Sequence, residues 1–119
     1  MQIPTFLLRK LYVKGSLENV EDGFQFKLKN SISNATAVAM EPLKVNGNEY
    51  SLDSTIIQAG DEQIEGDKIS AENAFPVTVG LEFILRVKGD QLPEGEHTID
   101  ISLTTKEVGK LAFDIKDAI

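Results

Sequence analysis

The chain has one histidine, His97, and two carboxylates, Glu94 and Glu96, come just before it. Imidazole and carboxylate together can bind zinc or iron, so these three residues form a candidate metal site. Zinc sites usually draw on several His or Cys ligands, and this sequence offers no second imidazole and no cysteine. His97 also shares strand parity with Ile99 and Ile101, which indicates a half-buried histidine that is hydrogen-bonded at the start of a strand. We therefore expect no metal there.

A second candidate metal site is an acidic loop between Gly60 and Asp67. Its four carboxylates are Asp61, Glu62, Glu65 and Asp67. Calcium prefers oxygen-rich, flexible loops, so weak calcium binding is one interpretation. The loop lacks the alternating Asp/Asn ligands and the terminal bidentate Glu of an EF-hand, and we expect a solvated acidic hairpin instead.

The sequence contains no recognisable catalytic set. Asp100, Asp114 and Asp117 could supply a glycosidase carboxylate pair, but with 19 acidic residues some pair always falls within reach of a sugar. A Gly-x-Ser-x-Gly elbow, a phosphate-binding loop and a His-Glu-x-x-His motif are all absent, and zero Cys excludes thiolate chemistry. We expect no catalytic residue and no cofactor. A hydrolase or lyase subunit that uses surface carboxylates ranks last among the functions considered.

The charge balance restricts the partners. Twelve Lys and Arg against 19 Asp and Glu give a formal net charge of −7, which argues against nucleic acid or an anionic membrane surface. No apolar segment approaches the roughly 20 residues needed to span a bilayer. Arg9 and Lys10 interrupt the N-terminal apolar run, so a secretory signal is not expected. We predict a cytoplasmic protein with no nucleic-acid and no membrane partner.

The elements that must position these residues are strands, because apolar and polar residues alternate with period two along most of the chain. The apolar positions of the long runs are Phe24, Phe26 and Leu28; Val77, Val79, Leu81, Phe83, Leu85 and Val87; Ile99, Ile101 and Leu103; and Leu111, Phe113 and Ile115. Shorter candidates lie at 36–45, 49–52 and 55–59, and a first strand is expected over 11–17. About seven to nine strands with frequent turns predict an all-β, antiparallel β-sandwich of Ig-like architecture, in one domain over residues 1–119.

Turn and breaker residues agree with this fold. Asn46-Gly47 is a strong hairpin signal, since a type I′ turn needs positive φ at both central positions. Pro42 marks an edge or bent strand, because proline cannot donate to a ladder. Gly80 lies inside the longest alternating run, where we expect a bulge. No long helix is expected.

The N-terminal segment is more apolar than a fraying terminus needs to be. Its apolar residues are Ile3, Phe6, Leu7, Leu8, Leu11 and Tyr12. We expect a core strand that also forms an interface, because an exposed apolar patch on a monomer promotes aggregation. A short helix with Pro4 in its first turn, which would align Leu7, Leu8 and Leu11, is the alternative. This segment predicts a homo-oligomer or a protein partner subunit.

The segment IPTFLLRKLYVKGSL (residues 3–17) resembles a group of small uncharacterised archaeal and bacterial all-β proteins, some of which are labelled hydroxymethylglutaryl-CoA reductase. The chain itself shows neither a dinucleotide site nor a catalytic acid–base set, so we expect no hydride transfer from it. The chain is also similar to the β-subunits of C-glycoside deglycosidases, which are β-sandwich accessory chains. This similarity is carried by Asn19 and by the segments DGFQF (22–26), LKVNG (43–47) and LPEGEH (92–97). Residues 30–40 depart from the aromatic, Arg-rich segment of those subunits, and no catalytic residue is carried over.

Together these observations predict a non-catalytic interaction module that self-associates or serves as the accessory subunit of a larger complex. The alternative is a small-ligand binder, with carbohydrates or acyl compounds as candidates. Sugar binders typically display aromatic platforms, whereas most rings here fall at core parity. Tyr12 and Tyr50 are the only rings that we expect at the surface.

Overall fold

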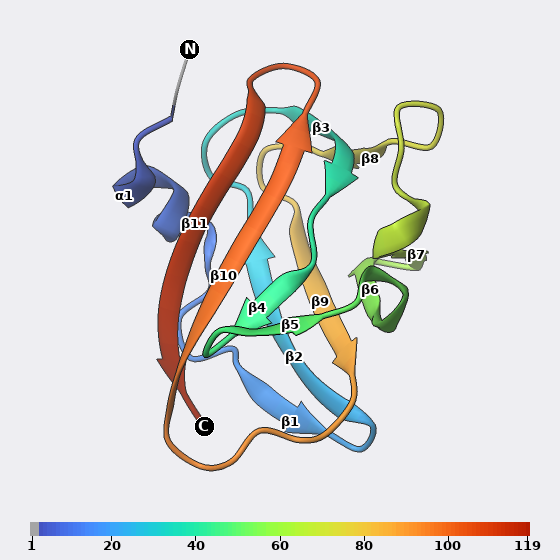
Figure 1. Cartoon of the computed structure of the whole chain (residues 1–119). Coiled ribbons are helices and arrows are strands. Elements are labelled where there is room, and N and C mark those ends of the chain that lie inside the picture. Colours follow the sequence, from blue (N-terminus) through green and yellow to red (C-terminus); the bar gives the residue numbers. More distant parts are fainter. Residues whose placement is uncertain (1–2) are drawn as a thin grey trace.

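Two antiparallel sheets face each other across one core in the computed structural model, which describes residues 3–119 (Figure 1). The first sheet runs in the order β1 (Glu18–Val20), β2 (Gly23–Lys29), β9 (Glu82–Lys88), β6 (Thr55–Ala59) and β7 (Glu62–Glu65). The second contains β5 (Asn48–Tyr50), β4 (Leu43–Val45), β10 (Glu96–Thr105), β3 (Ala35–Met40), β8 (Phe75–Val77) and β11 (Gly109–Ala118). The predicted all-β sandwich is confirmed.

The strands between residues 3 and 119 number eleven rather than seven to nine, and Pro42 accounts for part of the difference. The expected strand over 36–45 is broken at this proline into β3 and β4. Both pieces pair with the same edge of β10: β4 at Ile99 and Asp100, and β3 near Thr105. The opposite edge of β10 pairs with β11 along its whole length.

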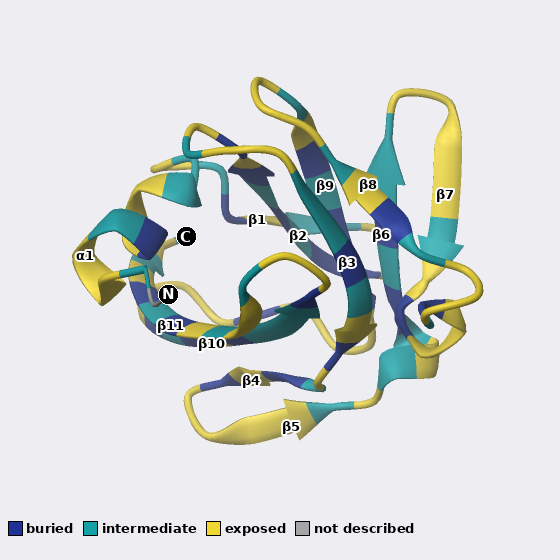
Figure 2. Cartoon of the chain, turned by 90° about the horizontal axis from the view of Figure 1, so that it is seen from above, coloured by how far each residue is buried: buried dark blue, intermediate teal, exposed yellow. Residues whose placement is uncertain are grey.

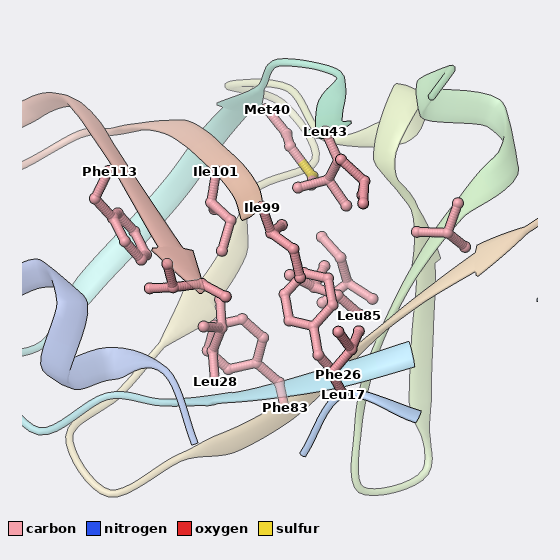
Figure 3. Packing of buried hydrophobic residues seen from close by; sticks show 14 of the residues in the cluster. Leu17, Phe26, Leu28, Met40, Leu43, Phe83, Leu85, Ile99, Ile101 and Phe113 are labelled. Carbon is pink, nitrogen blue, oxygen red and sulfur yellow. The ribbon is translucent and has the colours of Figure 1, made fainter. Parts of the chain in front are cut away.

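Inward-facing residues of both sheets fill the core, as Figure 2 shows by the buried stripes along β2, β9, β3 and β10. Phe24, Phe26, Val87 and Ile99 are completely buried. Figure 3 shows Phe113 pointing from β11 toward Leu28 of the facing sheet. Successive side chains of a strand point to opposite faces of its sheet, and one face of each sheet packs against the other sheet. The apolar residues at every second position therefore form the core.

The Asn46-Gly47 turn forms as predicted, while the bulge expected at Gly80 is wrong. Asn46 has φ 54° and Gly47 has φ 84°, the positive values that join β4 to β5 in a two-residue turn. Gly80, with φ 88°, lies in a turn that Leu81 N–H closes on the Thr78 carbonyl. The alternating run 77–87 is thus not one strand, since β8 and β9 belong to opposite sheets.

The N-terminal segment begins with helix α1 (Thr5–Leu8) and the 3₁₀ turn η1 (Arg9–Leu11), so the strand expected over 11–17 is wrong. A short helix, the alternative interpretation, does form, but Pro4 is its N-cap and Leu11 lies in the 3₁₀ turn that follows. Only Tyr12 makes a bridge, to Leu28, before the chain turns at Gly15 with φ 82°. Two further 3₁₀ turns, η2 (Leu52–Ser54) and η3 (Gly66–Lys68), flank β6 and β7. No helix within residues 3–119 is long and apolar enough to cross a membrane.

Candidate binding site

His97 lies at the start of β10 and is 3% exposed, so it is more deeply buried than expected. Its Nε2 lies 2.7 Å from the Pro93 carbonyl oxygen, and its Nδ1 lies 2.8 Å from Asn46 Nδ2. A carbonyl oxygen only accepts hydrogen bonds, so Nε2 carries the proton and Nδ1 accepts from the amide. Both ring nitrogens are therefore occupied: Nδ1 holds the β4–β5 turn against β10, and Nε2 holds the loop that leads into β10. The nearby Glu94 and Glu96 are exposed.

The acidic residues of the second candidate metal site lie on an exposed hairpin. Asp61 is in the turn between β6 and β7, Glu62 and Glu65 bound β7, and Asp67 follows in η3. Among residues 3–119, no three His, Cys, Asp or Glu side chains come together in a group that could hold a metal ion. The structure thus spreads these four carboxylates along a solvated edge.

Asp117 is the carboxylate with the richest set of partners, and its role is structural. Its Oδ2 accepts hydrogen bonds from Tyr12 Oη at 2.5 Å, from Gly15 N–H at 2.9 Å and from Leu17 N–H at 3.5 Å. Burial raises the pKa of Asp117, but hydrogen bonds from Tyr12, Ala118, Gly15 and Leu17 outweigh it and hold that pKa below its ordinary value. Burial, followed by the hydrogen bond to this carboxylate, raises the pKa of Tyr12. Asp117 therefore fastens residues 12–17 to the end of β11.

The other carboxylates considered for glycosidase chemistry are also held in the fold or isolated. Asp114 receives the Arg9 guanidinium at 2.7 Å, and this hydrogen bond, more than their Coulombic attraction, lowers the pKa of Asp114. Asp100 lies directly opposite Asp114 on the outer face of β10 and β11. Asp117 lies on the inner face, at the far end of the strand. These three residues do not converge on one site.

The N-terminal residues predicted to form an interface take different environments. Leu8 is 3% exposed and belongs to the core, while Ile3, Leu11 and Tyr12 pack against the core and are partly buried. Leu7 is half-buried, and Phe6 is 61% exposed on the outside of α1. Phe6 is therefore the large side chain of this set that is most exposed to solvent, while Ile3, Leu8, Leu11 and Tyr12 help to close the sandwich.

The candidate binding site is an apolar cavity of about 60 Å³ at the end of the sandwich where α1, the β2–β3 loop and the β10–β11 hairpin meet, near the top of Figure 1. We call it the loop-end cavity. Its apolar lining consists of Ile3, Leu8, Leu11, Leu28, Ile32, Ala35, Val77, Phe83, Leu103, Val108, Leu111 and Phe113. Ile3, Ile32 and Val108 are only partly buried, so the cavity reaches the surface between them.

Asn30 holds the β2–β3 loop on one side of the loop-end cavity. It is 5% exposed, and its Nδ2 donates to the carbonyls of Ser33 and Val77, both at 2.8 Å. Its Oδ1 accepts from Ile32 N–H at 3.1 Å. The Nδ2 and the Oδ1 of this side-chain amide are thus both engaged in hydrogen bonds within the fold. Asn30 therefore shapes the rim of the cavity and presents no free polar group to a ligand.

Thr105 and Glu107 hold the β10–β11 hairpin on the other side. Thr105 Oγ1 donates to the Gly109 carbonyl at 3.2 Å and accepts from Val108 N–H at 3.1 Å. Glu107 accepts from Thr36 N–H at 2.7 Å and from Thr36 Oγ1 at 2.9 Å, and the backbone bond is the main reason that the pKa of Glu107 falls below its usual value. Asn30, Thr105 and Glu107 thus contribute hydrogen-bonded polar groups to the rim of an apolar cavity, and the exposed Lys29, Ser33 and Asn34 complete this rim.

The sequence did not reveal this cavity. Asn30 was one available signal, because it continues the inward parity of Phe24, Phe26 and Leu28 and is polar. A polar residue at a core position must find internal hydrogen-bond partners, and such residues often organise a loop. The remaining lining residues come from segments far apart in the sequence, and only the fold brings them together.

No curated protein matches this sequence. A family model described as "Hydroxymethylglutaryl-CoA reductase, N-terminal domain" matches residues 7–119, which is nearly the entire chain. This match confirms the resemblance carried by residues 3–17, whereas the similarity to C-glycoside deglycosidase β-subunits stays a prediction. By this match, the chain belongs to the hydroxymethylglutaryl-CoA reductase N-terminal domain family.

Proposed function

We propose that this domain is a non-catalytic interaction module that binds a protein partner by taking an aliphatic side chain of that partner into the loop-end cavity. The observation that carries the proposal is the apolar lining of this cavity, beside which the polar side chains of Asn30, Thr105 and Glu107 are already hydrogen-bonded within the fold. A site of this kind mainly offers apolar burial and shape to a ligand.

The size of the loop-end cavity favours a side chain over a larger ligand. A buried cavity of roughly 150 Å³ is large enough for benzene, so one of about 60 Å³ has room for only a few methyl groups. Burying one methylene contributes about 0.8 kcal/mol, so filling the cavity supports docking but needs further contacts around it for strong binding.

The family description indicates which partner to test first. Its members are named as N-terminal domains of hydroxymethylglutaryl-CoA reductases, so we propose a catalytic reductase chain or domain as the partner. The hydroxymethylglutaryl group itself is polar and carries a carboxylate. Burying it in an apolar cavity without new hydrogen bonds would cost several kcal/mol, so the substrate is a poorer candidate than a protein side chain.

Binding of a carbohydrate or a long acyl chain, the alternative function, finds less support. Phe24, Phe26 and Phe83 are buried, and the large exposed ring among residues 3–119, Phe6, lies on the outside of α1 and does not line the cavity. A sugar platform would need an exposed ring beside the cavity.

The cavity can be tested with N-acetyl-leucine-N-methylamide as a probe, followed by methyl NMR at millimolar concentrations. We expect chemical-shift changes confined to methyl groups of the lining, such as those of Leu8, Leu28 and Leu111. Val108→Asp places a charge at the mouth and should abolish these changes. Val79→Asp is the matched control, because Val79 is 54% exposed in a turn outside the lining. Shifts spread over the surface, or none, would contradict the proposal.

A further inference from the structure

Most sheet edges in the described part of the chain are protected against pairing with another strand. β1 and β5 have three residues each, and short edge strands give little to pair with. β7 carries Glu62 and Glu65, and β8 carries Pro76, which has no N–H to donate. The strand β11 differs, because it has ten residues and pairs only along the side that faces β10.

The hydrogen bonds of β10 establish which groups of β11 point outward. The carbonyls of Thr98 and Ser102 accept from Asn46 and Glu41, so even-numbered residues of β10 bond toward β4 and β3. Odd-numbered residues of β10 therefore bond to β11, and in the antiparallel register their partners are odd-numbered too. The N–H and C=O groups of Lys110, Ala112, Asp114 and Lys116 consequently project away from the sheet.

The N-terminal segment protects only part of this edge. Arg9 Nε donates to the Asp114 carbonyl at 2.9 Å, and the α1–η1 segment packs alongside β11 at this level. On the side of β11 that faces away from β10, no strand within residues 3–119 pairs with Lys110 or Ala112. An open groove lined by Ile3, Thr5, Leu8, Val108, Lys110, Leu111 and Ala112 runs there between α1 and the edge. Ile3, Leu8, Val108 and Leu111 also line the loop-end cavity, so the groove and the cavity are continuous.

The charges around this edge favour an acidic occupant. Two carboxylates nearby are paired with cations, Asp114 with Arg9 and Glu41 with Lys110 at 2.9 Å, whereas Glu107 is hydrogen-bonded to the neutral Thr36 and Asp100, opposite Asp114, makes no ion pair with the described residues. Three cations on the same elements, Lys10, Lys106 and Lys116, make no ion pair with the other described residues. These three cations outnumber Asp100 and Glu107, the carboxylates of this edge that no cation pairs with, so the edge carries a small excess of positive charge on a chain whose net charge is −7.

We propose that the partner adds an extended segment to the β11 edge at residues 110–112, with acidic residues flanking one aliphatic side chain that enters the loop-end cavity. This inference rests on the proposed function and names the chemistry of the partner. Strand addition supplies main-chain hydrogen bonds for affinity, and the cavity supplies specificity for a side chain. A second copy of the chain is a poorer occupant, because two chains that each carry a net charge of −7 repel each other.

The probe is the peptide acetyl-Asp-Glu-Val-Leu-Val-Glu-Asp-amide, titrated against the ¹⁵N-labelled full chain. At saturation we expect amide hydrogen exchange of Lys110 and Ala112 to slow by about tenfold or more, because both groups gain a partner. Peptide N-methylated at alternate residues along the pairing edge should bind about fivefold weaker per bond lost, while methylation along the opposite edge should have no effect. Replacing the four acidic residues by lysine should weaken binding by about tenfold or more.

Ala112→Pro removes the outward N–H and should weaken peptide binding. The melting temperature of this variant shows whether it is still folded. The N-methylated peptides test the same hydrogen bonds on the unaltered protein. If N-acetyl-leucine-N-methylamide shifts the cavity methyls but the peptide leaves the Lys110 and Ala112 amides unchanged, the strand-addition proposal is overturned and the proposed function stands. If neither probe shifts these groups, both proposals fail. Equal affinity for the two methylated peptides would also overturn strand addition.

Discussion

Replacing Asp117 by asparagine tests whether the N-terminal segment is part of the folded domain or a separable arm. In the structure, one oxygen of this carboxylate accepts hydrogen bonds from Tyr12 Oη at 2.5 Å and from Gly15 N–H at 2.9 Å. Asp117→Asn keeps the shape of the side chain but removes its charge, and its amide can offer only one oxygen to these donors. The substitution therefore weakens the attachment of residues 12–17 without opening a cavity.

The expected loss follows from the type of bond. A hydrogen bond to a charged group contributes about 1.5 to 3 kcal/mol, and a donor left unsatisfied costs a further 1 to 3 kcal/mol. Since asparagine retains one acceptor, we expect the free energy of unfolding to fall by about 2 to 4 kcal/mol. For a domain of this length such a loss lowers the melting temperature by roughly 10 °C.

The matched control is Asp114→Asn, on the same strand and held to the same segment by Arg9. Its ion pair is exposed, with side chains 52% and 40% accessible, so the loss should be under about 1 kcal/mol. Urea unfolding of the three proteins at pH 7 gives the comparison. Equal losses for the two substitutions, or a loss at Asp117 below about 0.5 kcal/mol, would refute the assignment of Asp117 as the main attachment.

The pH dependence of stability checks the same carboxylate independently. The folded-state pKa of Asp117 is lower than in the unfolded chain, where it is about 3.9. Its contribution is therefore present above about pH 4 and is lost as the pH falls through the folded-state value. Asp117→Asn should flatten the acid side of the stability curve measured by urea unfolding. An unchanged slope between wild type and variant would contradict the shifted pKa.

Further substitutions and treatments probe other parts of the account. Leu8→Ala should cost about 2 to 4 kcal/mol in urea unfolding because Leu8 is a core residue, whereas Phe6→Ala should change stability by under about 0.5 kcal/mol. Asn46→Ala should cost about 2 to 3 kcal/mol, because it loses the His97 and Thr98 hydrogen bonds and strains a backbone with φ 54°. A chelator should leave the melting temperature, measured by calorimetry, unchanged. A tightly bound metal would stabilise the folded state by mass action, so its removal would lower the melting temperature. A clear drop would therefore support a metal site at His97 or at Asp61–Asp67.

Local sequence signals predicted much of the sandwich, because each of the strands β2, β10 and β11 buries every second residue. Asn46-Gly47 predicted its turn for the same kind of local reason, the need for positive φ. The prediction of a bulge at Gly80 was wrong because the alternation of apolar and polar residues continues in step from Val77 to Leu81, across the turn. The strands on the two sides of this turn, β8 and β9, lie in different sheets. Period two alone cannot distinguish a bulge from a change of sheet.

The binding site was much less accessible to sequence reasoning than the fold. The N-terminal apolar residues were correctly singled out as unusual, but whether Leu8 faces the core or a partner depends on the packing of α1 against β11. The loop-end cavity depends on contacts between residues as distant in sequence as Ile3 and Val108. The open edge of β11 likewise depends on the fold, which leaves a groove between α1 and residues 110–112.

The most direct test of the central claim is to tag the chain in the cells that make it and to quantify the proteins that copurify with the wild type, Val108→Asp and Val79→Asp. Light scattering of each eluate gives the mass of the assembly. We predict one stoichiometric partner chain with the wild type and with Val79→Asp, and its loss with Val108→Asp although that variant stays folded. Equal recovery of the partner with all three proteins, or a wild type of 13.1 kDa with no partner, would contradict the account.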